Sequence, residues 1–271
     1  MTTIAGLTNQ GHRAGANQDS IGWDESRSLA FVADGLGGHA GGQVASDIVK
    51  QTLLDPAGSL DLKAAALRAH AAVAGAAEKD EALTGMASTL VAVQIARREA
   101  KVVWAGDSRA YLWRNGIISR LTRDHSMVQE LRELADLSET DVRSHPQRNQ
   151  VTNVLGTGEP APDTALLPMR NGDWILLCSD GLTGELRDEE IADILDAANT
   201  PSEASVRLIN AALERGGHDN VSVVVVQYDG RSKRVFNIRL SETEMGWLAA
   251  LGGVLLALSL AGILLWVRRK Q

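Results

Sequence analysis

The chain has 271 residues, of which 44% are hydrophobic and 23% are charged, and its formal net charge is −7. This composition excludes a disordered or fibrous protein, and the negative charge argues against a nucleic-acid binder that acts through a basic surface. Cys178 is the only cysteine, which excludes an internal disulfide framework and a zinc site made of several cysteines.

Residues 1–228 have the pattern of one α+β domain, in which short apolar runs alternate with turn residues. The predicted strands, in chain order, are 29–33, 90–96, 102–105, 110–113, 117–121, 174–178 and 221–227. The third, fourth and fifth of these are expected to form a meander, because Asn115-Gly116 is the most favourable short hairpin loop. The pattern therefore predicts largely antiparallel sheets.

Helices are predicted between these strands. Residues 64–77 are rich in alanine, and the apolar residues of 191–198 follow helical spacing. A further helix is expected from Pro201, because Thr200 and Glu203 form a capping box around it. The polar segment 137–165 contains three prolines and is predicted to be a long surface loop with a functional or mobile role.

A run of 21 residues without a charge, 247–267, stands near the C-terminus. As an α-helix it would be about 31 Å long, which matches the hydrocarbon core of a bilayer. Trp247 and Trp266 lie near its ends, where aromatic side chains favour the membrane interface. We therefore expect a single transmembrane helix at 247–267, followed by a short basic tail at 268–271.

The expected orientation follows from the N-terminus. The first ten residues have neither the basic nor the apolar stretch of a secretory signal, so we expect a cytoplasmic catalytic domain at the cell membrane. Residues 229–246 would be a basic juxtamembrane linker. Its apolar residues allow either an edge strand or a segment lying on anionic lipid, and the sequence leaves both open.

Aspartates stand next to the ends of several predicted strands. The four are Asp19, Asp34, Asp180 and Asp219. Because strand ends meet at the rim of a sheet, these carboxylates can converge, and hard divalent cations such as Mg²⁺ or Mn²⁺ would offset their repulsion. Gly35 would let its carbonyl approach such a cation. The alternative is that each Asp-Gly pair only marks a turn.

A set of motifs occurs in a fixed order along residues 1–228. They are Asn17-Gln18-Asp19, Asp34-Gly35-Leu36-Gly37-Gly38-His39, Ala87-Ser88-Thr89-Leu90, Gly106-Asp107-Ser108-Arg109, Cys178-Ser179-Asp180-Gly181-Leu182 and Asp219-Asn220. The ordered set resembles the metal-dependent protein phosphatases of type 2C in their compact bacterial form. This resemblance implies a sandwich of two antiparallel β-sheets flanked by α-helices.

The resemblance also implies two or three Mn²⁺ or Mg²⁺ ions. The metal ligands that it implies are Asp19, Asp34, Gly35, Asp107, Asp180 and Asp219. Asp34 would bridge two ions, and Asp180 and Asp219 would complete one of the two sites. The Gly35 carbonyl would bind the second ion, Asp19 would act through metal-bound water, and Asp107 would help hold a third ion.

Catalysis by a metal-activated water needs no protein nucleophile, so no covalent role is expected for Ser88, Ser108, Ser179 or Cys178. His39 is similar to the family's candidate general acid, which protonates the leaving hydroxyl. The alternative for His39 is a hydrogen bond to the backbone of its own loop.

The sequence departs from the family pattern at two positions. Family members usually carry a phosphate-gripping arginine where this chain has Ala14, and Arg13 lies one residue further away. A bulge at Gly15 would let Arg13 reach the phosphate. Asn153 occupies a loop position where the family often has arginine, which would alter the flap near the substrate.

The resulting hypothesis is a membrane-anchored phosphatase that hydrolyses phosphoserine and phosphothreonine on proteins and reverses serine/threonine kinase signalling. Its expected partners are phosphorylated proteins, among them a serine/threonine kinase and its targets, and the membrane, which the C-terminal helix would enter. No nucleic-acid partner is expected. The alternative is a pseudo-phosphatase that binds phosphorylated partners without turnover, for which the shifted Arg13 is the support. A third hypothesis makes the membrane anchor the dominant element and treats the domain as a scaffold.

Overall fold

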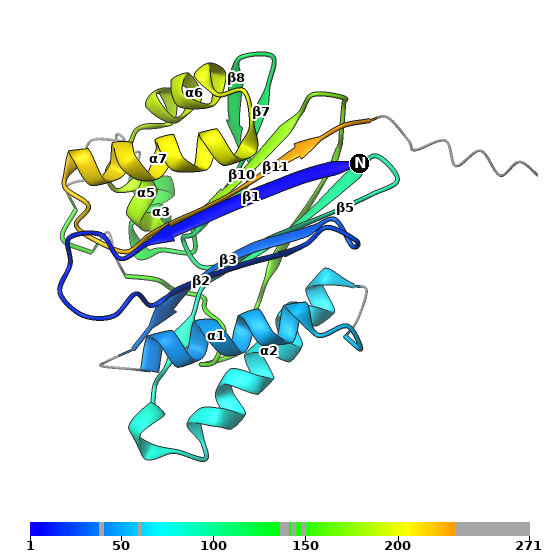
Figure 1. Ribbon diagram of the computed structural model, residues 1–271. Helices are drawn as coiled ribbons and strands as arrows, with labels where there is room; N and C mark the ends of the chain where they lie inside the picture. The colour runs from blue at the N-terminus through cyan, green and yellow to red at the C-terminus, as the bar shows by residue number, and fades with distance from the viewer. Residues whose placement is uncertain (38–40, 59–60, 136–140, 142–144, 148–149, 231–271) are drawn as a thin grey trace, which may run out of the picture. The chain divides into compact units, whose positions relative to one another are not determined.

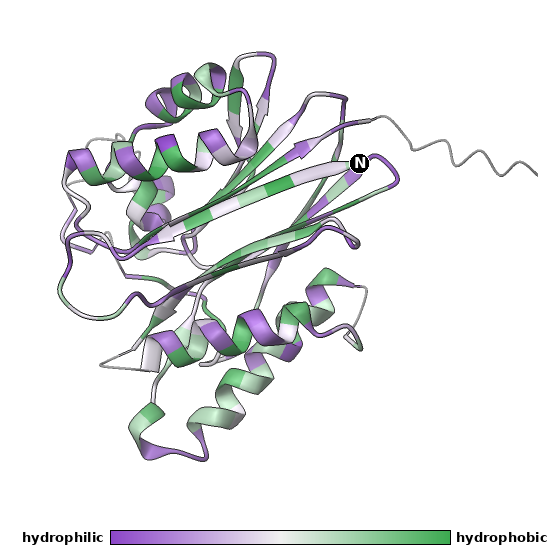
Figure 2. Ribbon diagram, viewed as in Figure 1, coloured by the Kyte–Doolittle hydropathy of each residue, from purple (hydrophilic) through white to green (hydrophobic). Residues whose placement is uncertain are grey.

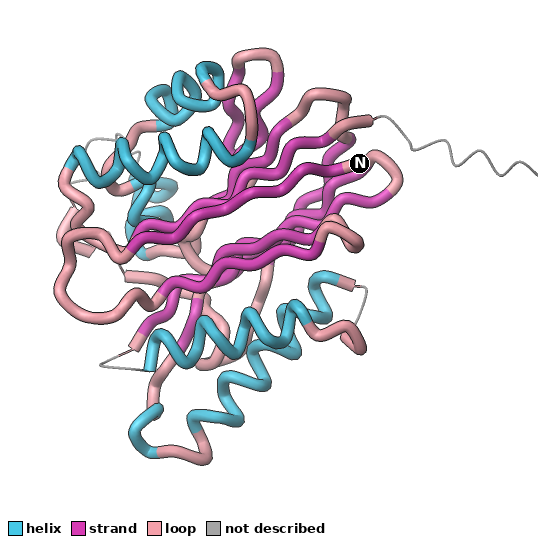
Figure 3. The backbone as a smooth tube through the Cα atoms, in the orientation of Figure 1, coloured by secondary structure: helices cyan, strands magenta, loops and turns pink. Residues whose placement is uncertain are grey.

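The protein is represented by a computed structural model that describes residues 1–37, 41–58, 61–135, 141, 145–147 and 150–230. Two antiparallel sheets lie face to face, and helices cover the outer face of each (Figure 1, Figure 3). The predicted α+β sandwich is therefore confirmed. The predicted transmembrane helix, most of the linker and the basic tail lie outside the described residues. Within the described ranges, no helix combines the length and the apolar character needed to cross a membrane.

The first sheet has five strands, and its two central strands are almost completely buried. In spatial order the strands are β1 (Thr2–Asn9), β11 (Val221–Tyr228), β10 (Trp174–Cys178), β7 (Arg109–Arg114) and β8 (Ile117–Arg120). β10 and β11 consist of near-continuous apolar runs, as expected for strands that are covered on both faces. Both strands were predicted from the sequence.

The second sheet follows the order β2 (Asp19–Asp24), β3 (Leu29–Leu36), β5 (Leu90–Ala96), β6 (Glu99–Ala105) and β9 (Asp163–Pro168), and the short β4 (Ala87–Ser88) pairs with the end of β3. Its pairings are antiparallel, like those of the first sheet. The sandwich therefore presents strand ends and turns at two opposite ends.

Two pairs of longer helices cover the sheets. α1 (Gly41–Leu54) and α2 (Leu62–Ala77) lie along the second sheet, and α6 (Asp188–Ala197) and α7 (Pro201–Arg215) lie along the first (Figure 1). Shorter helices are η1 (Glu81–Leu83), α3 (Met127–Ala135) and α5 (Asp180–Thr183). α7 begins as predicted, since the Thr200 hydroxyl accepts a hydrogen bond from the Glu203 backbone N–H at 3.2 Å.

The core consists of three apolar layers, one between the sheets and one under each pair of helices. Hydrophobic residues accordingly follow the strands and the inner faces of the helices (Figure 2). Large side chains such as Phe31, Leu90 and Leu176 are fully buried. Burial of each such side chain stabilises the fold by about 2 kcal/mol, so the strands form a rigid support for the residues at their ends.

The predicted three-stranded meander is wrong in its first strand. β6 belongs to the second sheet, whereas β7 and β8 belong to the first. The chain crosses between the sheets after Ala105, at Gly106, whose φ of +113° suits glycine. Local turn signals predict that neighbouring strands pair, but they do not show that the chain changes sheet. The β7–β8 hairpin at Asn115-Gly116 is confirmed.

The structure also corrects the predicted loop at 137–165, because β9 begins at Asp163. β9 is an edge strand with mostly exposed side chains, so it lacks the apolar run that marks a buried strand. β1 was not predicted, since polar threonines interrupt its apolar residues. α1 was not predicted because it begins with two glycines, Gly41 and Gly42, which disfavour helices.

Candidate active site

Four strand ends place aspartates at one end of the sandwich. Asp19 is the first residue of β2 and lies directly opposite Asp34 of β3 in the antiparallel register. In the other sheet, Asp180 follows the end of β10, and Asp219 precedes the start of β11, the neighbouring strand. The convergence predicted from the sequence is therefore present.

These residues surround a cavity of about 220 Å³. Its lining residues are Arg13, Gln18, Asp34, Gly35, Leu36, Gly37, Asp107, Val151, Asp180 and Asp219. Six of the predicted site residues are thus brought together, and Asp19 stands beside them on β2. His39 lies outside the described residues. Gln18, Leu36 and Val151 line the cavity although no role was predicted for them from the sequence.

The carboxylates destabilise one another's charged forms. Burial, together with the negative charges of Asp19 and Asp180, raises the pKa of Asp34 well above its ordinary value. Burial and the charge of Asp180 also raise the pKa of Asp107. Burial and the charge of Asp219 raise the pKa of Asp180. A set of acids that resist ionisation together is typical of a site that holds cations.

Asp19 combines burial with incomplete hydrogen bonding. Burial raises its pKa to about 6, and hydrogen bonds from Ser222 and Ser179 oppose that shift. The Ser179 hydroxyl donates to Asp19 Oδ2 at 2.8 Å, so this serine, for which no role was predicted, holds the carboxylate in place. Within the described part of the chain, Asp19 Oδ1 and Asp180 Oδ1 are buried without any hydrogen-bond partner.

One of these oxygens belongs to Asp180, which lines the cavity with three further carboxylates, and the other belongs to Asp19 beside it. Such a group suits a hard divalent cation, because Mg²⁺ and Mn²⁺ prefer oxygen ligands. As they stand, no three Asp, Glu, His or Cys side chains of the described residues are placed to hold one ion. Asp219 forms an ion pair with Arg13. The residues fit a divalent cation in donor type, and Asp219 would have to leave Arg13 to join them.

Arg13 lies at the cavity wall, as its predicted contact with phosphate requires. Its guanidinium forms an ion pair with Asp219, and the two side chains are 45% and 42% exposed. Gly15, two residues later, has a φ of +112° and lies in the loop between β1 and β2, so the irregularity predicted there as a bulge is part of a loop. The observed partner of Arg13 is therefore a carboxylate at the mouth of the cavity.

Close packing requires a glycine at position 35. A Cβ atom on Gly35 would lie 2.0 Å from the Gly42 carbonyl oxygen, and one on Gly42 would lie 2.6 Å from the Gly35 carbonyl oxygen. The first turn of α1 therefore packs directly against the end of β3. This contact fixes the backbone that follows Asp34.

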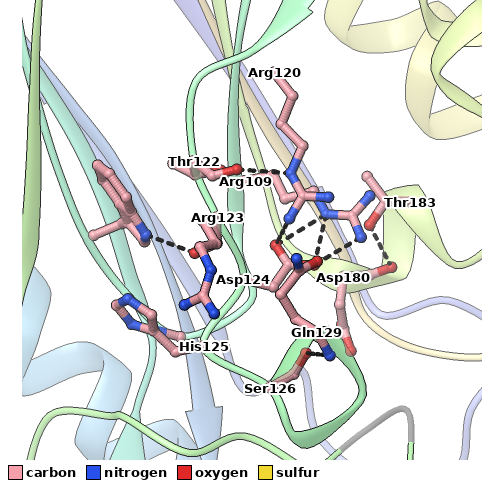
Figure 4. A network of polar contacts seen from close by, with 12 residues as sticks. Arg109, Arg120, Thr122, Arg123, Asp124, His125, Ser126, Gln129, Asp180 and Thr183 are labelled. Atoms are coloured by element: carbon pink, nitrogen blue, oxygen red, sulfur yellow. Dashed lines mark hydrogen bonds and ion pairs between the residues drawn. The ribbon is translucent and has the colours of Figure 1, made fainter. Parts of the chain in front are cut away.

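A network of polar contacts around Arg109 and Asp124 lies beside Asp180, one of the residues that line the cavity (Figure 4). Arg109 donates to Asp124 through Nε at 3.1 Å and Nη2 at 2.8 Å, and its Nη1 donates to the Tyr111 hydroxyl at 3.2 Å. Its positive charge lowers the pKa of both Asp107 and Asp180, against the larger effect of burial. The sequence indicated Arg109 only as a motif member. The signal that could have identified its role is its position two residues after the predicted ligand Asp107.

His125 connects the flap, which is the segment 150–161, to the turn that carries Asp107. Its backbone N–H donates to the Gly106 carbonyl at 2.9 Å, and its own carbonyl accepts from the Thr152 N–H at 2.8 Å. The Asn153 side-chain amide donates to His125 Nδ1 at 3.1 Å and to the Ala161 carbonyl at 2.7 Å. Asn153, the second departure from the family pattern, therefore holds the flap beside the cavity-lining Val151.

Comparison with known proteins gives a consistent assignment. A family model described as "Protein phosphatase 2C" matches residues 10–215, a range that includes Asp19, Asp34, Asp107 and Asp180. The chain is 34% identical over 237 residues to the serine/threonine phosphatase stp of Listeria monocytogenes, which covers 82% of this chain and 94% of that protein. It is 40% identical over 223 residues to the serine/threonine protein phosphatase PstP of Mycobacterium tuberculosis, which covers 79% of this chain and 43% of that protein.

Solved structures agree with this assignment. The Mycobacterium tuberculosis serine/threonine phosphatase PstP/Ppp superposes with a TM-score of 0.78 at 36% identity and covers 84% of this chain and 99% of that one. The catalytic domain of PstP in complex with two manganese ions superposes with a TM-score of 0.75 at 34% identity, covering 83% of this chain and 97% of that one.

Proposed function

This chain belongs to the protein phosphatase 2C family of metal-dependent serine/threonine phosphatases, and we propose that it hydrolyses phosphoserine and phosphothreonine on proteins with a water activated by two or three Mn²⁺ or Mg²⁺ ions. The observation that carries the proposal is the convergence of Asp34, Asp107, Asp180 and Asp219 on one cavity. The manganese ions of the solved relative support the choice of cation.

The proposed ligand roles are those that the resemblance to the family implies. Asp34 would bridge two ions, Asp180 and Asp219 would complete one site, and the Gly35 carbonyl would serve the other. Asp107 would hold a third ion, and Asp19 would act through water. Bound divalent cations supply a nucleophilic water at neutral pH and stabilise the charge of the phosphoryl oxygens.

Other residues of the chain would orient the substrate. The Arg13 guanidinium, at the mouth of the cavity, has the fork geometry that pairs with phosphate oxygens. Leu36 and Val151 would place apolar surface beside the phosphorylated residue and exclude water. Ser179 keeps Asp19 in its orientation. His39 would protonate the leaving hydroxyl of serine or threonine.

We also propose that residues 247–267 anchor the enzyme in the cell membrane, with the catalytic domain on the cytoplasmic side, where it reverses the action of a serine/threonine kinase. The uncharged 21-residue run and its flanking tryptophans support this location. In cells that express the full chain, the protein should remain in the membrane fraction after an alkaline wash, and a chain ending at residue 240 should not. Release of the full chain by the wash would contradict the anchor.

The activity is tested with the full chain and a panel of phosphothreonine and phosphoserine peptides. Phosphate release should require Mn²⁺ or Mg²⁺ and stop when a chelator is added. Lack of turnover with both cations would contradict the proposed reaction. Tight peptide binding without turnover would instead support the pseudo-phosphatase alternative.

A further inference from the structure

The β5–β6 hairpin has an unusual loop. Ala96 pairs with Glu99, so the two-residue loop is Arg97-Arg98, and these residues have φ values of +49° and +69°. A loop with two positive φ angles favours Asn-Gly, because long L-residues are strained in the left-handed region. The β7–β8 hairpin of the same protein has that favoured loop, Asn115-Gly116, with φ values of +52° and +78°. The Arg97-Arg98 loop therefore keeps two arginines where other residues would be more stable.

Among the described residues, the two arginines have no partner that explains the strain. Both residues are exposed, and within the described chain no ion pair or hydrogen bond engages either guanidinium. The neighbouring Glu99 is also exposed and forms no ion pair with them. Strain that persists at such a site points to a functional reason for the residues.

A second cavity lies beside this loop. It has a volume of about 370 Å³, and Arg97, Arg98, Ile95, Tyr228 and Gly230 are among the residues that line it. Gly230 is the last described residue before the basic segment 231–246, so the chain leaves the domain next to the arginines. The loop between β5 and β6 accordingly lies near the N-terminus and the end of β11 (Figure 1).

This cavity is at the end of the sandwich opposite the aspartates. β5 and β6 pair from Ala96 and Glu99 at the loop to Leu90 and Ala105, just before the turn that carries Asp107. Seven residues of extended strand span about 20 Å. A surface that contacts the arginine loop would therefore leave the catalytic cavity accessible.

We propose that the Arg97-Arg98 loop and its cavity dock on the surface of an anionic phospholipid bilayer, where the guanidinium groups pair with lipid phosphates. The proposal rests on the membrane location proposed above, since the segment that follows Gly230 would bring this end of the domain to the bilayer. Positive charge on the loop, positive charge in 231–246 and the exit point of the chain all favour this partner. Docking would direct the catalytic cavity away from the membrane, towards phosphoproteins.

The test measures binding to vesicles by co-sedimentation. Residues 1–232 form a compact unit with its own cores and match complete chains of solved relatives, so this domain is suitable without the C-terminal segment. Vesicles of phosphatidylglycerol and phosphatidylcholine are compared with vesicles of phosphatidylcholine alone. The domain should bind the anionic vesicles, and added salt should weaken the binding.

The informative variant replaces the loop with the residues of the other hairpin, Arg97→Asn with Arg98→Gly. Each arginine near an anionic surface contributes roughly a fivefold effect, so binding should fall about 20-fold. The same variant should melt a few degrees higher, because it relieves the strain. Arg97→Lys with Arg98→Lys should bind like the parent. Arg187→Gln with Arg207→Gln, which removes two exposed positive charges elsewhere, should also bind like the parent.

Three results would overturn the inference. They are failure of the parent domain to bind anionic vesicles, equal binding by the Asn-Gly variant, and a loss of phosphopeptide affinity in that variant without a loss of vesicle binding. The last result would make the loop a protein-docking site. Turnover of a small phosphate ester is measured in parallel and should be unchanged in every loop variant. An inactive domain that still binds vesicles would contradict the proposed function alone. An active full chain whose domain does not bind vesicles would contradict only this inference.

Discussion

The carboxylates at the two ends of the sandwich have opposite electrostatic surroundings. At the end with the arginine loop, Asp173 is only 2% exposed and is paired with Arg114 at 2.6 Å. Asp24 at the same end accepts hydrogen bonds from Ser26 and Arg27, which lower its pKa to about 2. At the catalytic end, Asp34 and Asp107 face other carboxylates, and their pKa values are raised.

This difference shows that the catalytic end loses stability of the fold. A paired carboxylate stabilises the fold, whereas a group of buried carboxylates that repel one another destabilises it until cations bind. The same residue type therefore serves stability at one end and chemistry at the other. Matched substitutions at the two ends test this contrast.

The largest effect is expected from removing the central carboxylate. Asp34→Asn should lower kcat/KM for a phosphothreonine peptide by about 10³-fold or more, because the loss of cation binding removes several kcal/mol of transition-state stabilisation. Glu99→Gln makes the same chemical change at the opposite end and should leave kcat/KM unchanged. A decrease in kcat/KM of less than tenfold in Asp34→Asn would contradict the proposed difference between the two ends.

The next effect concerns the arginines. Arg13→Ala should raise KM for the peptide by about 10- to 100-fold and change kcat less, since a charge-assisted hydrogen bond to phosphate contributes about 1.5–3 kcal/mol. Arg97→Ala, at the opposite end, is the matched control and should not change KM for a soluble peptide. An unchanged KM in Arg13→Ala would show that Arg13 serves only as the partner of Asp219.

The pH dependence of stability should differ from that of an ordinary domain when a chelator is present. The pKa of Asp19 is raised from 3.8 to about 6, so between these values the folded state binds more protons than the unfolded state. The free energy of unfolding should therefore fall as the pH rises through this window, by about 2–3 kcal/mol for Asp19, and level off above pH 7.

Urea unfolding at a series of pH values measures this slope. Asp19→Asn should flatten it, and saturating Mn²⁺ should oppose it, because cations bind the ionised carboxylates. Asp24→Asn at the opposite end should leave the slope above pH 5 intact, since the pKa of Asp24 is lowered from 3.8 to about 2 and both values lie below this range. Stability that rises with pH between 4 and 6 in the chelator would contradict the proposed electrostatics.

The smallest effect is expected from the flap. Asn153→Ala removes the hydrogen bonds to His125 and Ala161 and should lower the free energy of unfolding by about 1 kcal/mol and kcat/KM by less than tenfold. Asn171→Ala is its counterpart at the other end, where Asn171 Oδ1 accepts the Gly230 N–H at 2.9 Å. This second variant should lose similar stability with full activity. Equal activity in both variants would show that Asn153 does not position the flap.

The sequence predicted the catalytic end better than the rest of the fold, and the reason is physical. Asp34 and Asp180 each follow a continuous apolar run, so their position near a strand end is encoded locally. The crossing of the chain between sheets at Gly106 depends on packing over both sheets, which no local pattern shows. The pairing of Arg13 with Asp219 and of Asn153 with His125 joins segments far apart in the chain, so only the folded structure could reveal them.

The end of the sandwich with opposed carboxylates is built to bind divalent cations. Calorimetric titration of the full chain with Mn²⁺ tests it most directly. At least two ions should bind to the parent and to Glu99→Gln, and this binding should be lost or greatly weakened in Asp34→Asn. Equal stoichiometry and affinity in the parent and Asp34→Asn would contradict the account.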